Sequence, residues 1–420
     1  MTYDEAIAFW YGRINYEVRA AAPGDLKLER MRALLKLLGD PHDRLRIVHV
    51  TGTKGKGSTA AMLASVLRRA GYRVGLFTSP HLVDVEERIQ VDGVPISRPE
   101  FAARMAEVAA AVRKLDAGPF PPPTFFEIGT ALGFLHFVCR RVDVAVVEVG
   151  LGGRFDSTNV CHPMVSVITC IGLDHTAQLG STLEAIAYQK AGIIKPRVPV
   201  VSGEVEPGPR AVIERVAHEA GSRLLQAGRD FVVEERKLGL LGAHQQANAA
   251  VAVATLDVLR SGGLPIPDPA VAKGLAEVRW PARIEVVSRN PTVILDCAHN
   301  VPSAEALVRT LRESVPVAGR TAVVFAVSLD KQYPEMLRIL AGYFGHFHLC
   351  RYGNNPRCVP PEKLAEVLRE VAPESPATVH ASAAEAWAAA RAAAQPEDLV
   401  CVTGSVFLAG ELQPLVRAVQ

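Results

Sequence analysis

Short apolar, β-branched segments alternate with longer segments of helical pattern along most of this chain. The segments with strand character are residues 46–50, 143–149, 164–169, 198–202, 292–296, 321–327 and 399–404. Strands that alternate with helices predict a parallel sheet covered on both faces, because each parallel connection places a helix against one face of the sheet. The pattern therefore predicts an α/β protein.

The length and the local composition indicate more than one domain. A typical domain has about 150 residues, so 420 residues allow two or three, and a hydrophobic content of 49% supplies material for their cores. Residues 281–291 combine two prolines with polar side chains, and a new series of strands and helices begins after them. We therefore predict a boundary near residue 284, with a larger domain at 1–283 and a smaller, Rossmann-like α/β domain at 284–420.

The charge balance argues against partners that are held by a general electrostatic field. Lys and Arg number 46 and Asp and Glu 44, which gives a net charge of +2. The first residues are acidic where a signal peptide needs a basic region, and no apolar run reaches the roughly 18 residues of a membrane span. Seven cysteines are scattered without a C-x-x-C pair, as expected of buried thiols in a reducing compartment. We expect a cytoplasmic monomer that binds small molecules and neither nucleic acid nor membranes.

A glycine-rich loop follows the first strand directly. Residues 46–50 lead into TGTKGKGS at 51–58 and then into a helical pattern, for which Ser58 is the expected N-cap and Gly71 the expected end. In this order of strand, loop and helix, backbone N–H groups converge on phosphate oxygens, while a lysine and a hydroxyl reach the phosphates and Mg²⁺. The loop departs from the pattern G-x-x-x-x-G-K-[ST], but an ordinary flexible turn would need neither the lysine nor the serine. The residues expected at the phosphates are Gly52, Thr53, Gly55, Lys56, Gly57 and Ser58.

Glu148 lies at the end of the apolar strand pattern 143–149. A carboxylate at the carboxyl end of a parallel strand points into the crevice where such folds bind ligands, and its oxygens suit Mg²⁺. The glycines of the following GLGGR allow close backbone approach, but the loop does not fit a dinucleotide-binding pattern, because Phe155 occupies the position of the third glycine. Glu148 is therefore a candidate metal ligand; the alternative is an exposed acid at the end of a strand.

The loop TGTKGKGS resembles the nucleotide loop of the Mur ligase superfamily, and further stretches narrow the resemblance to the folylpolyglutamate synthase/dihydrofolate synthase family. These stretches cover nearly the whole chain in order: DLKLERM at 25–31, TSPHLVDVEERIQVDG at 78–93, TFFEIGT at 124–130, EVGLGGRFDSTN at 148–159, LDHTAQLGSTLEAIAYQKAGIIK at 173–195, HQQANAA at 244–250, WPAR at 280–283, LDCAHN at 295–300 and VTGS at 402–405. One departure is Lys54, where the family usually has Asn. This extra cation either helps to bind phosphate or is turned outward.

The resemblance implies a metal site with an unusual lysine. One or two Mg²⁺ ions are expected on Ser58, Ser79, Glu148 and His175, and Lys56, His175 and Lys190 are the implied catalytic residues. Because a bare ammonium is repelled by Mg²⁺, the family implies that Lys190 reacts with CO₂ to give a carbamate, N6-carboxylysine. From the residues alone, a surface lysine on a helix is the favoured interpretation of Lys190, and His175 alone is more often a satisfied loop or core residue than a ligand.

Further residues match family positions that bind ATP and glutamate. The amide of Asn248 suits the edge of adenine, although a helix amide facing solvent fits equally well. Arg283 and Asp296 match positions that reach the nucleotide from the second domain, which implies that domain closure completes the site. The candidates for binding glutamate, which remain the least specified, are Asp330, Lys331 and Ser405.

The family also implies a binding site for a pterin-containing substrate. An aromatic pair beside polar groups suits stacking on a flat heterocycle, although Phe125 and Phe126 also fit a helix core, which is the favoured position for at least one of them. The folate-binding candidates are Asp25, Leu26, Thr124, Phe125, Phe126, Glu127, Phe155, Asp156 and Ser157.

The implied activity is an ATP-dependent ligase that adds L-glutamate to dihydropteroate, to tetrahydrofolate polyglutamates, or to both, through an acyl phosphate. Three alternatives remain open. A muramyl-type ligase shares the loop but usually carries an extra N-terminal domain; a P-loop kinase or GTPase leaves LDCAHN and the Lys190 segment unexplained; and a regulatory nucleotide-binding module would lack chemistry. ATP turnover that depends on a carboxylate substrate distinguishes the ligase from the last of these.

Overall fold

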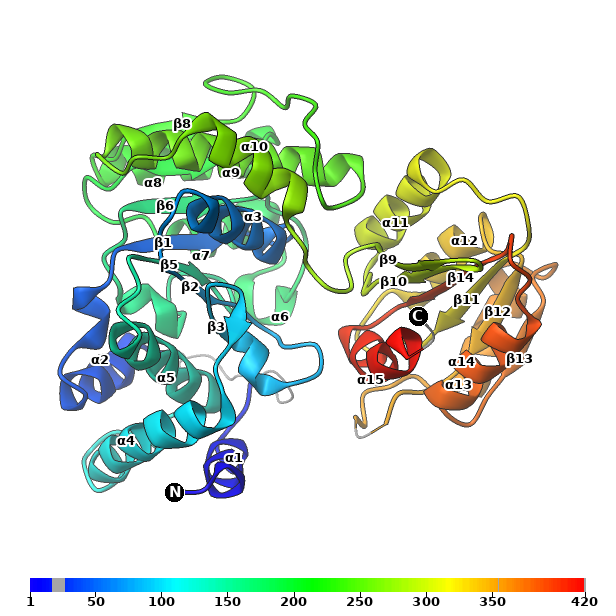
Figure 1. Ribbon diagram of the computed structural model, residues 1–420, viewed down its shortest axis with the longest axis horizontal. Coiled ribbons are helices and arrows are strands. Elements are labelled where there is room, and N and C mark those ends of the chain that lie inside the picture. Colours follow the sequence, from blue (N-terminus) through cyan, green and yellow to red (C-terminus); the bar gives the residue numbers. More distant parts are fainter. Residues whose placement is uncertain (17–26, 354, 419–420) are drawn as a thin grey trace. The chain divides into compact units, whose positions relative to one another are not determined.

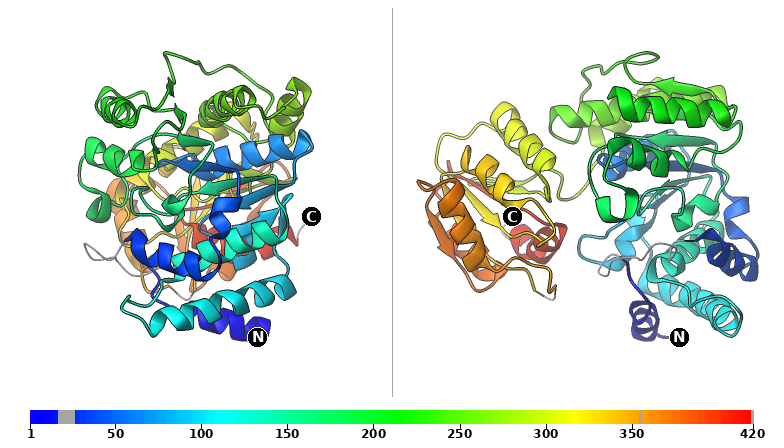
Figure 2. Two further views of the ribbon diagram at one scale, coloured as in Figure 1. Left: turned by 90° about the vertical axis from the view of Figure 1, so that its left-hand side faces the viewer. Right: turned by 180° about the vertical axis from the view of Figure 1, so that it is seen from behind.

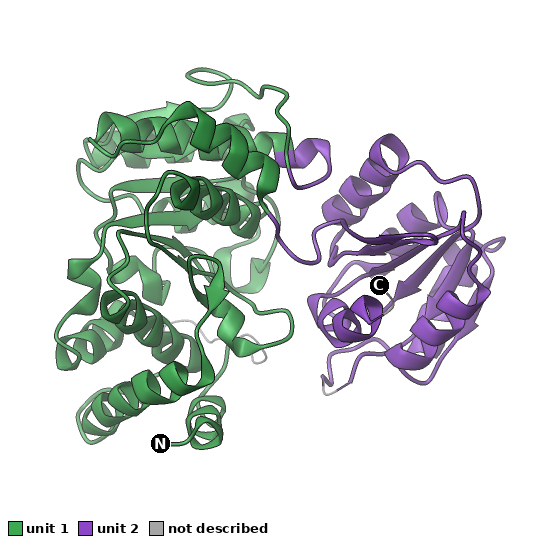
Figure 3. Ribbon diagram, in the orientation of Figure 1, with its two compact units in different colours: residues 1–238, 246–278 green, residues 239–245, 279–420 purple. Residues whose placement is uncertain are grey.

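The computed structural model describes residues 1–16, 27–353 and 355–418, and the chain forms two compact units (Figure 3). Unit 1 comprises Met1–Leu238 and Gln246–Val278, and unit 2 comprises Gly239–Gln245 and Arg279–Gln420. Unit 2 therefore begins a few residues before the predicted boundary at 284, and a short earlier segment also belongs to it. Each unit has its own sheet.

The sheet of unit 1 is parallel except at one edge. Its described strands are β1 (Ile47–Thr51), β2 (Val74–Phe77), β3 (Ile89–Val91), β4 (Val94–Pro95), β5 (Val144–Glu148), β6 (Val165–Ile168), β7 (Val200–Ser202) and β8 (Leu224–Gln226). They lie in the order β4-β3-β2-β5-β1-β6-β7-β8, and only β3 and β4 pair in antiparallel fashion with their neighbours. β1 and β5 are buried along their whole length, as expected of central strands covered on both faces.

Helices lie on both faces of this sheet (Figures 1 and 2). They are α1 (Tyr3–Tyr11), α2 (Leu28–Leu37), α3 (Lys56–Arg69), α4 (Arg98–Asp116), α5 (Phe125–Cys139), α6 (Thr176–Leu179), α7 (Leu183–Ala191), α8 (Pro207–Glu219), α9 (Ala243–Ser261) and α10 (Asp268–Glu277), with 3₁₀ turns η1 (Pro41–Arg44), η2 (Val85–Arg88) and η3 (Ser157–Val160). α3 packs on β1, β2 and β5, and α10 covers α3. Ile47, Ala145 and Val147 belong to a core cluster with residues of α4 and α5. Because successive strand residues alternate between faces, the same strands also supply the side chains that meet α3.

Unit 2 is a smaller α/β unit. Its described strands are β9 (Glu285–Arg289), β10 (Thr292–Leu295), β11 (Thr321–Phe325), β12 (His346–Leu349), β13 (Ala377–Val379) and β14 (Leu399–Thr403), and its helices are α11 (Val301–Ser314), α12 (Tyr333–Ala341), α13 (Pro361–Val371), α14 (Ala383–Ala393) and α15 (Val406–Arg417). The strand order is β13-β12-β11-β14-β10-β9, with β9 antiparallel to β10 and the other pairs parallel. The predicted fold class, a parallel-sheet P-loop domain followed by a Rossmann-like one, is therefore confirmed.

Two local expectations differ from the structure. Ser58 does not cap α3, because the left-handed turn at Gly55 starts the helix earlier, and Ser58 is buried inside its first turns. The cysteines are free thiols as expected, but they are not all buried: Cys139 is exposed and Cys170 is partly exposed. Among the described residues, no helix is long and apolar enough to cross a membrane.

Candidate active site

The candidate residues of unit 1 gather at one edge of its sheet. β2, β5, β1 and β6 are neighbours and run parallel, so their carboxyl ends share that edge. Ser79 comes shortly after β2, Glu148 ends β5, the loop 51–58 follows β1, and His175 lies between β6 and α6. The topology thus brings all four predicted metal ligands to this edge, since Ser58 lies in the helix that follows the loop.

The loop 52–55 needs its glycines for steric reasons. Gly55 has φ 79° and forms the N-cap position of α3, and a Cβ there would collide with the side chain of Asn248. A Cβ on Gly52 would collide with the hydroxyl of Thr169. The close contact at Gly55 also places the amide of Asn248 against the loop.

Lys190 is the most unusual group at this edge. It lies on α7, its side chain is 4% exposed, and its Nζ donates a hydrogen bond to the carbonyl of Gly52 at 2.8 Å. Burial, assisted by the nearby charge of Lys56, lowers the pKa of Lys190 from 10.5 to about 7. Lys190 is therefore buried, whereas the residues alone favoured a position on the surface. At neutral pH a large fraction of its amine is uncharged.

Glu148 and Lys56 form an ion pair at the end of β5. The Lys56 Nζ lies 3.9 Å from Glu148 Oε1, and the Glu148 side chain is 5% exposed. Glu148 is therefore a buried carboxylate and not an exposed acid at the end of a strand. Lys56 is the first residue of α3, where the helix dipole adds positive charge.

Lys54 is turned toward Asp174. The Lys54 Nζ lies 3.5 Å from Asp174 Oδ2, and the pair links the phosphate loop to the segment that leads to His175. Thr53 joins the same two segments: its backbone N donates to Cys170 O at 2.7 Å, and its hydroxyl donates to Gly172 O at 3.1 Å. The loop and the segment after β6 are therefore one hydrogen-bonded structure.

Sequence reasoning missed Thr169 as part of this structure. Its hydroxyl donates to the carbonyl of Lys54 at 2.5 Å, and it is buried. Thr169 ends the predicted strand 164–169, so the rule that singled out Glu148, a polar residue at the carboxyl end of a strand, applied to it as well. Asp174 was missed because its partner lies 120 residues away in the sequence.

Some folate-binding candidates have structural partners. Thr124 and Glu127 form a capping box at the start of α5, and the two carboxylate oxygens of Glu127 share the N–H of Arg30 Nε, at 2.9 and 2.7 Å. Phe125 is buried and stacks on Trp10 with 4.4 Å between ring centroids, so it is the one that belongs to the core. Phe126 is only partly buried. Asp25 and Leu26 lie outside the described residues.

The segment after GLGGR is organised by Asp156. Its buried carboxylate accepts hydrogen bonds from the backbone N–H of Gly150 at 3.0 Å and of Leu151 at 2.9 Å. Ser157 is buried and its hydroxyl pairs with a neighbouring hydroxyl, whereas Phe155 is 48% exposed. Phe155 is thus the candidate in this segment with the most surface available to a ligand.

In unit 2, Asp296 holds the first turn of the unit in place. Its carboxylate accepts from Ile284 N at 3.0 Å, Ala298 N at 2.7 Å and Thr403 Oγ1 at 3.0 Å. Arg283 donates to the carbonyl of Ala282 at 3.1 Å, directly beside this turn. Arg283 also contacts the thiol of Cys297, the residue after Asp296, so both predicted residues lie near the carboxyl end of β10.

The glutamate-binding candidates do not all share partners. Asp330 Oδ1 accepts from Arg357 Nη2 at 2.7 Å, and Lys331 Nζ lies 3.4 Å from Asp330 Oδ2. Ser405 is buried and caps α15, accepting from Phe407 N at 3.1 Å. Asp330 and Lys331 thus present a mixed-charge group, and Ser405 lies at a helix N-terminus.

Comparisons with known proteins identify the family of this chain. The family model of the Mur ligase middle domain matches residues 50–200, and that of the Mur ligase glutamate ligase domain matches residues 282–406. The dihydrofolate synthase/folylpolyglutamate synthase of Bacillus subtilis is 40% identical over 361 residues, which cover 80% of this chain and 82% of that protein. The folylpolyglutamate synthase of Lacticaseibacillus casei is 36% identical, with 98% of each chain covered.

This chain belongs to the folylpolyglutamate synthase/dihydrofolate synthase family. The solved structure of E. coli FolC in complex with DHPP and ADP is 32% identical to this chain and has a TM-score of 0.86. The match covers 100% of this chain and 98% of that one. Family membership makes the protein a ligase of the Mur superfamily, as the sequence predicts. The loop 51–58, Glu148 and Lys190 fall within the match to the middle domain.

The pKa of Lys190 predicts how stability depends on pH. Between about pH 7 and the ordinary value of 10.5, the unfolded chain binds a proton that the folded chain has released. Burying this lysine therefore costs most stability below about pH 7, and the cost falls as the pH rises toward 10.5. As the pH rises from about 7 to 10.5, the free energy of unfolding of the wild type should therefore increase relative to that of Lys190→Met. Urea unfolding of both proteins in CO₂-free buffer measures this difference.

The exposed Lys36 gives the control, because Lys36→Met removes a lysine that is not buried. If the difference in unfolding free energy between wild type and Lys190→Met were the same at every pH in the window, the lowered pKa would be wrong.

Proposed function

We propose that this protein uses ATP to join L-glutamate to dihydropteroate, to reduced folates, or to both. The observation that carries the proposal is the buried Lys190 amine on the carbonyl of a glycine-rich phosphate loop, beside the ion pair of Lys56 and Glu148. The printed names of the relatives support it, since they are folylpolyglutamate and dihydrofolate synthases, and solved relatives are complexes with ADP or AMPPCP.

Amide formation from a carboxylate needs activation, because a carboxylate is a poor electrophile. In the proposed reaction, an oxygen of the folate carboxylate attacks the γ-phosphorus of ATP, the bond to the β-phosphate breaks, and ADP leaves. The amine of glutamate then attacks the acyl carbon, loses a proton, and expels phosphate that carries the former carboxylate oxygen. Holding the reactants together supplies a large part of the rate enhancement.

The phosphate loop is suited to stabilise the transferred phosphoryl group. The turn at Gly55 exposes backbone N–H groups at the start of α3, where the helix dipole is positive. Lys56, at the same helix start, is placed to pair with phosphate oxygens, and its present partner is Glu148. Asn248 lies against the loop, which supports a contact with ATP.

The oxygen donors at this edge fit Mg²⁺. Glu148 supplies a buried carboxylate, and Ser58 and Ser79 supply hydroxyls, all of which are hard ligands of the kind this ion prefers. His175 is the further candidate. Bound there, Mg²⁺ would neutralise negative charge on the phosphates. Because of the chemistry of these donors, we propose that the residues bind one or two magnesium ions.

The environment of Lys190 supports carbamate formation. Only an uncharged amine attacks CO₂, and a pKa of about 7 leaves much of this amine uncharged at neutral pH. The nitrogen forms a bond to the carbon of CO₂ and loses a proton, which replaces a cation by an anion. An anion near the loop, in place of an ammonium, is compatible with a metal ion.

The remaining assignments follow from the polar groups described above. Arg283 and Asp296 are proposed to contact the nucleotide and Phe155 to contact the folate, while Asp330, Lys331 and Ser405 remain the candidates for glutamate. The free thiols support a reducing, cytoplasmic location. We further propose that the enzyme acts on small molecules as a monomer, without nucleic acid or a membrane.

The first prediction from this proposal concerns substrate dependence. Purified protein with Mg²⁺, ATP and glutamate should release phosphate when dihydropteroate or tetrahydrofolate is added, and much less without an acceptor. The better acceptor identifies the dominant activity. Turnover that is indifferent to both glutamate and folate would instead favour a P-loop NTPase or kinase, and turnover that needs a UDP-linked muramyl substrate would favour the muramyl-type ligase.

A second prediction concerns the carbamate. Lys190→Ala should lose activity by about 100-fold or more, since it removes an anion from a preorganised site, and acetate or a similar small carboxylate should restore part of it. Acetamide, which has the same shape without the charge, is the control and should not restore activity. Full activity of the variant without any added carboxylate would refute the role of Lys190.

A further inference from the structure

Glu204 lies two residues after the end of β7 and is a buried carboxylate that belongs to none of the candidate sets above. Its side chain is 2% exposed, and its two oxygens accept three backbone hydrogen bonds. Oε2 accepts from Ile171 N at 2.5 Å, while Oε1 accepts from Val205 N at 2.9 Å and from Glu206 N at 2.8 Å. Burying a carboxylate is unfavourable unless it is hydrogen-bonded, and these three backbone amides offset the cost of burying Glu204.

The amide of Ile171 belongs to the segment 169–175, which joins β6 to α6 and ends at His175. On the side of the phosphate loop, this segment is bonded through Thr169 Oγ1 to Lys54 O and through Asp174 to Lys54 Nζ. Glu204 bonds the middle of the same segment from β7. The segment is therefore fixed at both places, between the phosphate loop and the end of β7.

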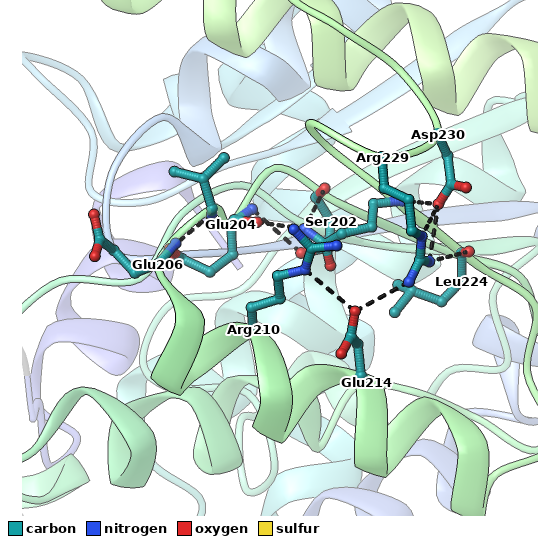
Figure 4. A network of polar contacts seen from close by, with 10 residues as sticks. Ser202, Glu204, Glu206, Arg210, Glu214, Leu224, Arg229 and Asp230 are labelled. Carbon is teal, nitrogen blue, oxygen red and sulfur yellow. Dashed lines mark hydrogen bonds and ion pairs between the residues drawn. The ribbon is translucent and has the colours of Figure 1, made fainter.

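The backbone at the end of β7 is itself fixed by hydrogen bonds and close contacts, which limits the movement of Glu204. Gly203 N donates to Ile168 O at 2.8 Å, and a Cβ on Gly203 would collide with Thr169 O. The amide of Gln226, on β8, donates to the carbonyls of Glu204 and Ser202. Figure 4 shows Glu204 within the polar network that continues to Arg210 and Glu214 of α8.

We propose that Glu204 is a positioning residue of the ligase site. By fixing Ile171, it sets where Asp174 and His175 lie relative to the phosphate loop. His175 has φ 49° and caps a helix of only four residues, so its place depends on the segment before it and not on a long helix. This proposal rests on the proposed function, and in particular on the role of His175 at the metal.

The test uses Glu204→Gln in the full-length protein. Gln has nearly the same shape, but it offers one acceptor oxygen and turns an N–H group toward a backbone donor. We expect kcat to fall about tenfold, because small displacements in an active site are costly. We also expect the Mg²⁺ concentration for half-maximal activity to rise several-fold. Both are measured on folded protein, counted by active-site titration.

The matched control is Glu214→Gln. Glu214 lies in the same polar network, but its carboxylate accepts from Arg210 at 3.2 Å and from Arg229 at 3.0 Å, on the surface of α8. It should leave kcat and the Mg²⁺ dependence unchanged. A purely structural role of Glu204 would lower the melting temperature and the folded fraction of Glu204→Gln, while kcat per folded site and the Mg²⁺ dependence would equal those of the wild type; that result would overturn the proposal.

Hydrogen exchange of the wild type tests the same contact without any variant, in case Glu204→Gln does not fold. The Ile171 amide should exchange much more slowly than the amides of Thr176 and Ala177, which belong to exposed residues in the first turn of α6. Equal exchange rates would overturn the proposal. Failure of the proposed function is separate, since it would show as wild-type turnover that needs neither glutamate nor folate.

Discussion

β1 pairs in parallel with β5 on one side and with β6 on the other, and this pairing decides where the chemistry of unit 1 lies. Three loops leave the same edge of the sheet: the phosphate loop after β1, the Glu148 loop after β5 and the segment 169–175 after β6. Because parallel strands place all their carboxyl ends together, residues that lie about 100 positions apart in the sequence become neighbours. The helices on both faces keep the central strands buried, and the charged candidate residues gather where these strands end.

Charged side chains at this edge form close ion pairs. Glu148 lies against Lys56, and Lys54 lies against Asp174, so each of these four charges has an opposite charge nearby. Lys190 is different, because burial and Lys56 push its pKa down and its amine bonds to a backbone carbonyl. Burial and the nearby Lys56 destabilise the protonated form of Lys190, and a reaction that converts the amine to an anion would remove this unfavourable cation. The arrangement suits a site that must hold a highly charged nucleotide.

Much of the fold could be predicted from the sequence. All seven predicted strand segments are strands, because buried parallel strands are nearly continuous apolar runs. The other described strands were not predicted: β2, for example, has a glycine among its four residues, and all three residues of β13 are exposed. Local rules also placed the glycine loop and Glu148. They failed for Lys190, whose burial depends on tertiary packing, since its Nζ bonds to the carbonyl of Gly52, 138 residues away in the sequence. Contacts between distant segments, such as Lys54 with Asp174, leave no pattern in a single sequence.

The central claim is that this edge activates a carboxylate by phosphoryl transfer. Folate labelled with ¹⁸O in its reacting carboxylate tests the claim most directly. Incubated with the protein, Mg²⁺, ATP and glutamate, it should give inorganic phosphate that carries one ¹⁸O atom for each amide bond formed, measured by mass spectrometry. Phosphate without the label, in the presence of amide product, would contradict the account, because it would mean that water and not the carboxylate attacks the γ-phosphorus.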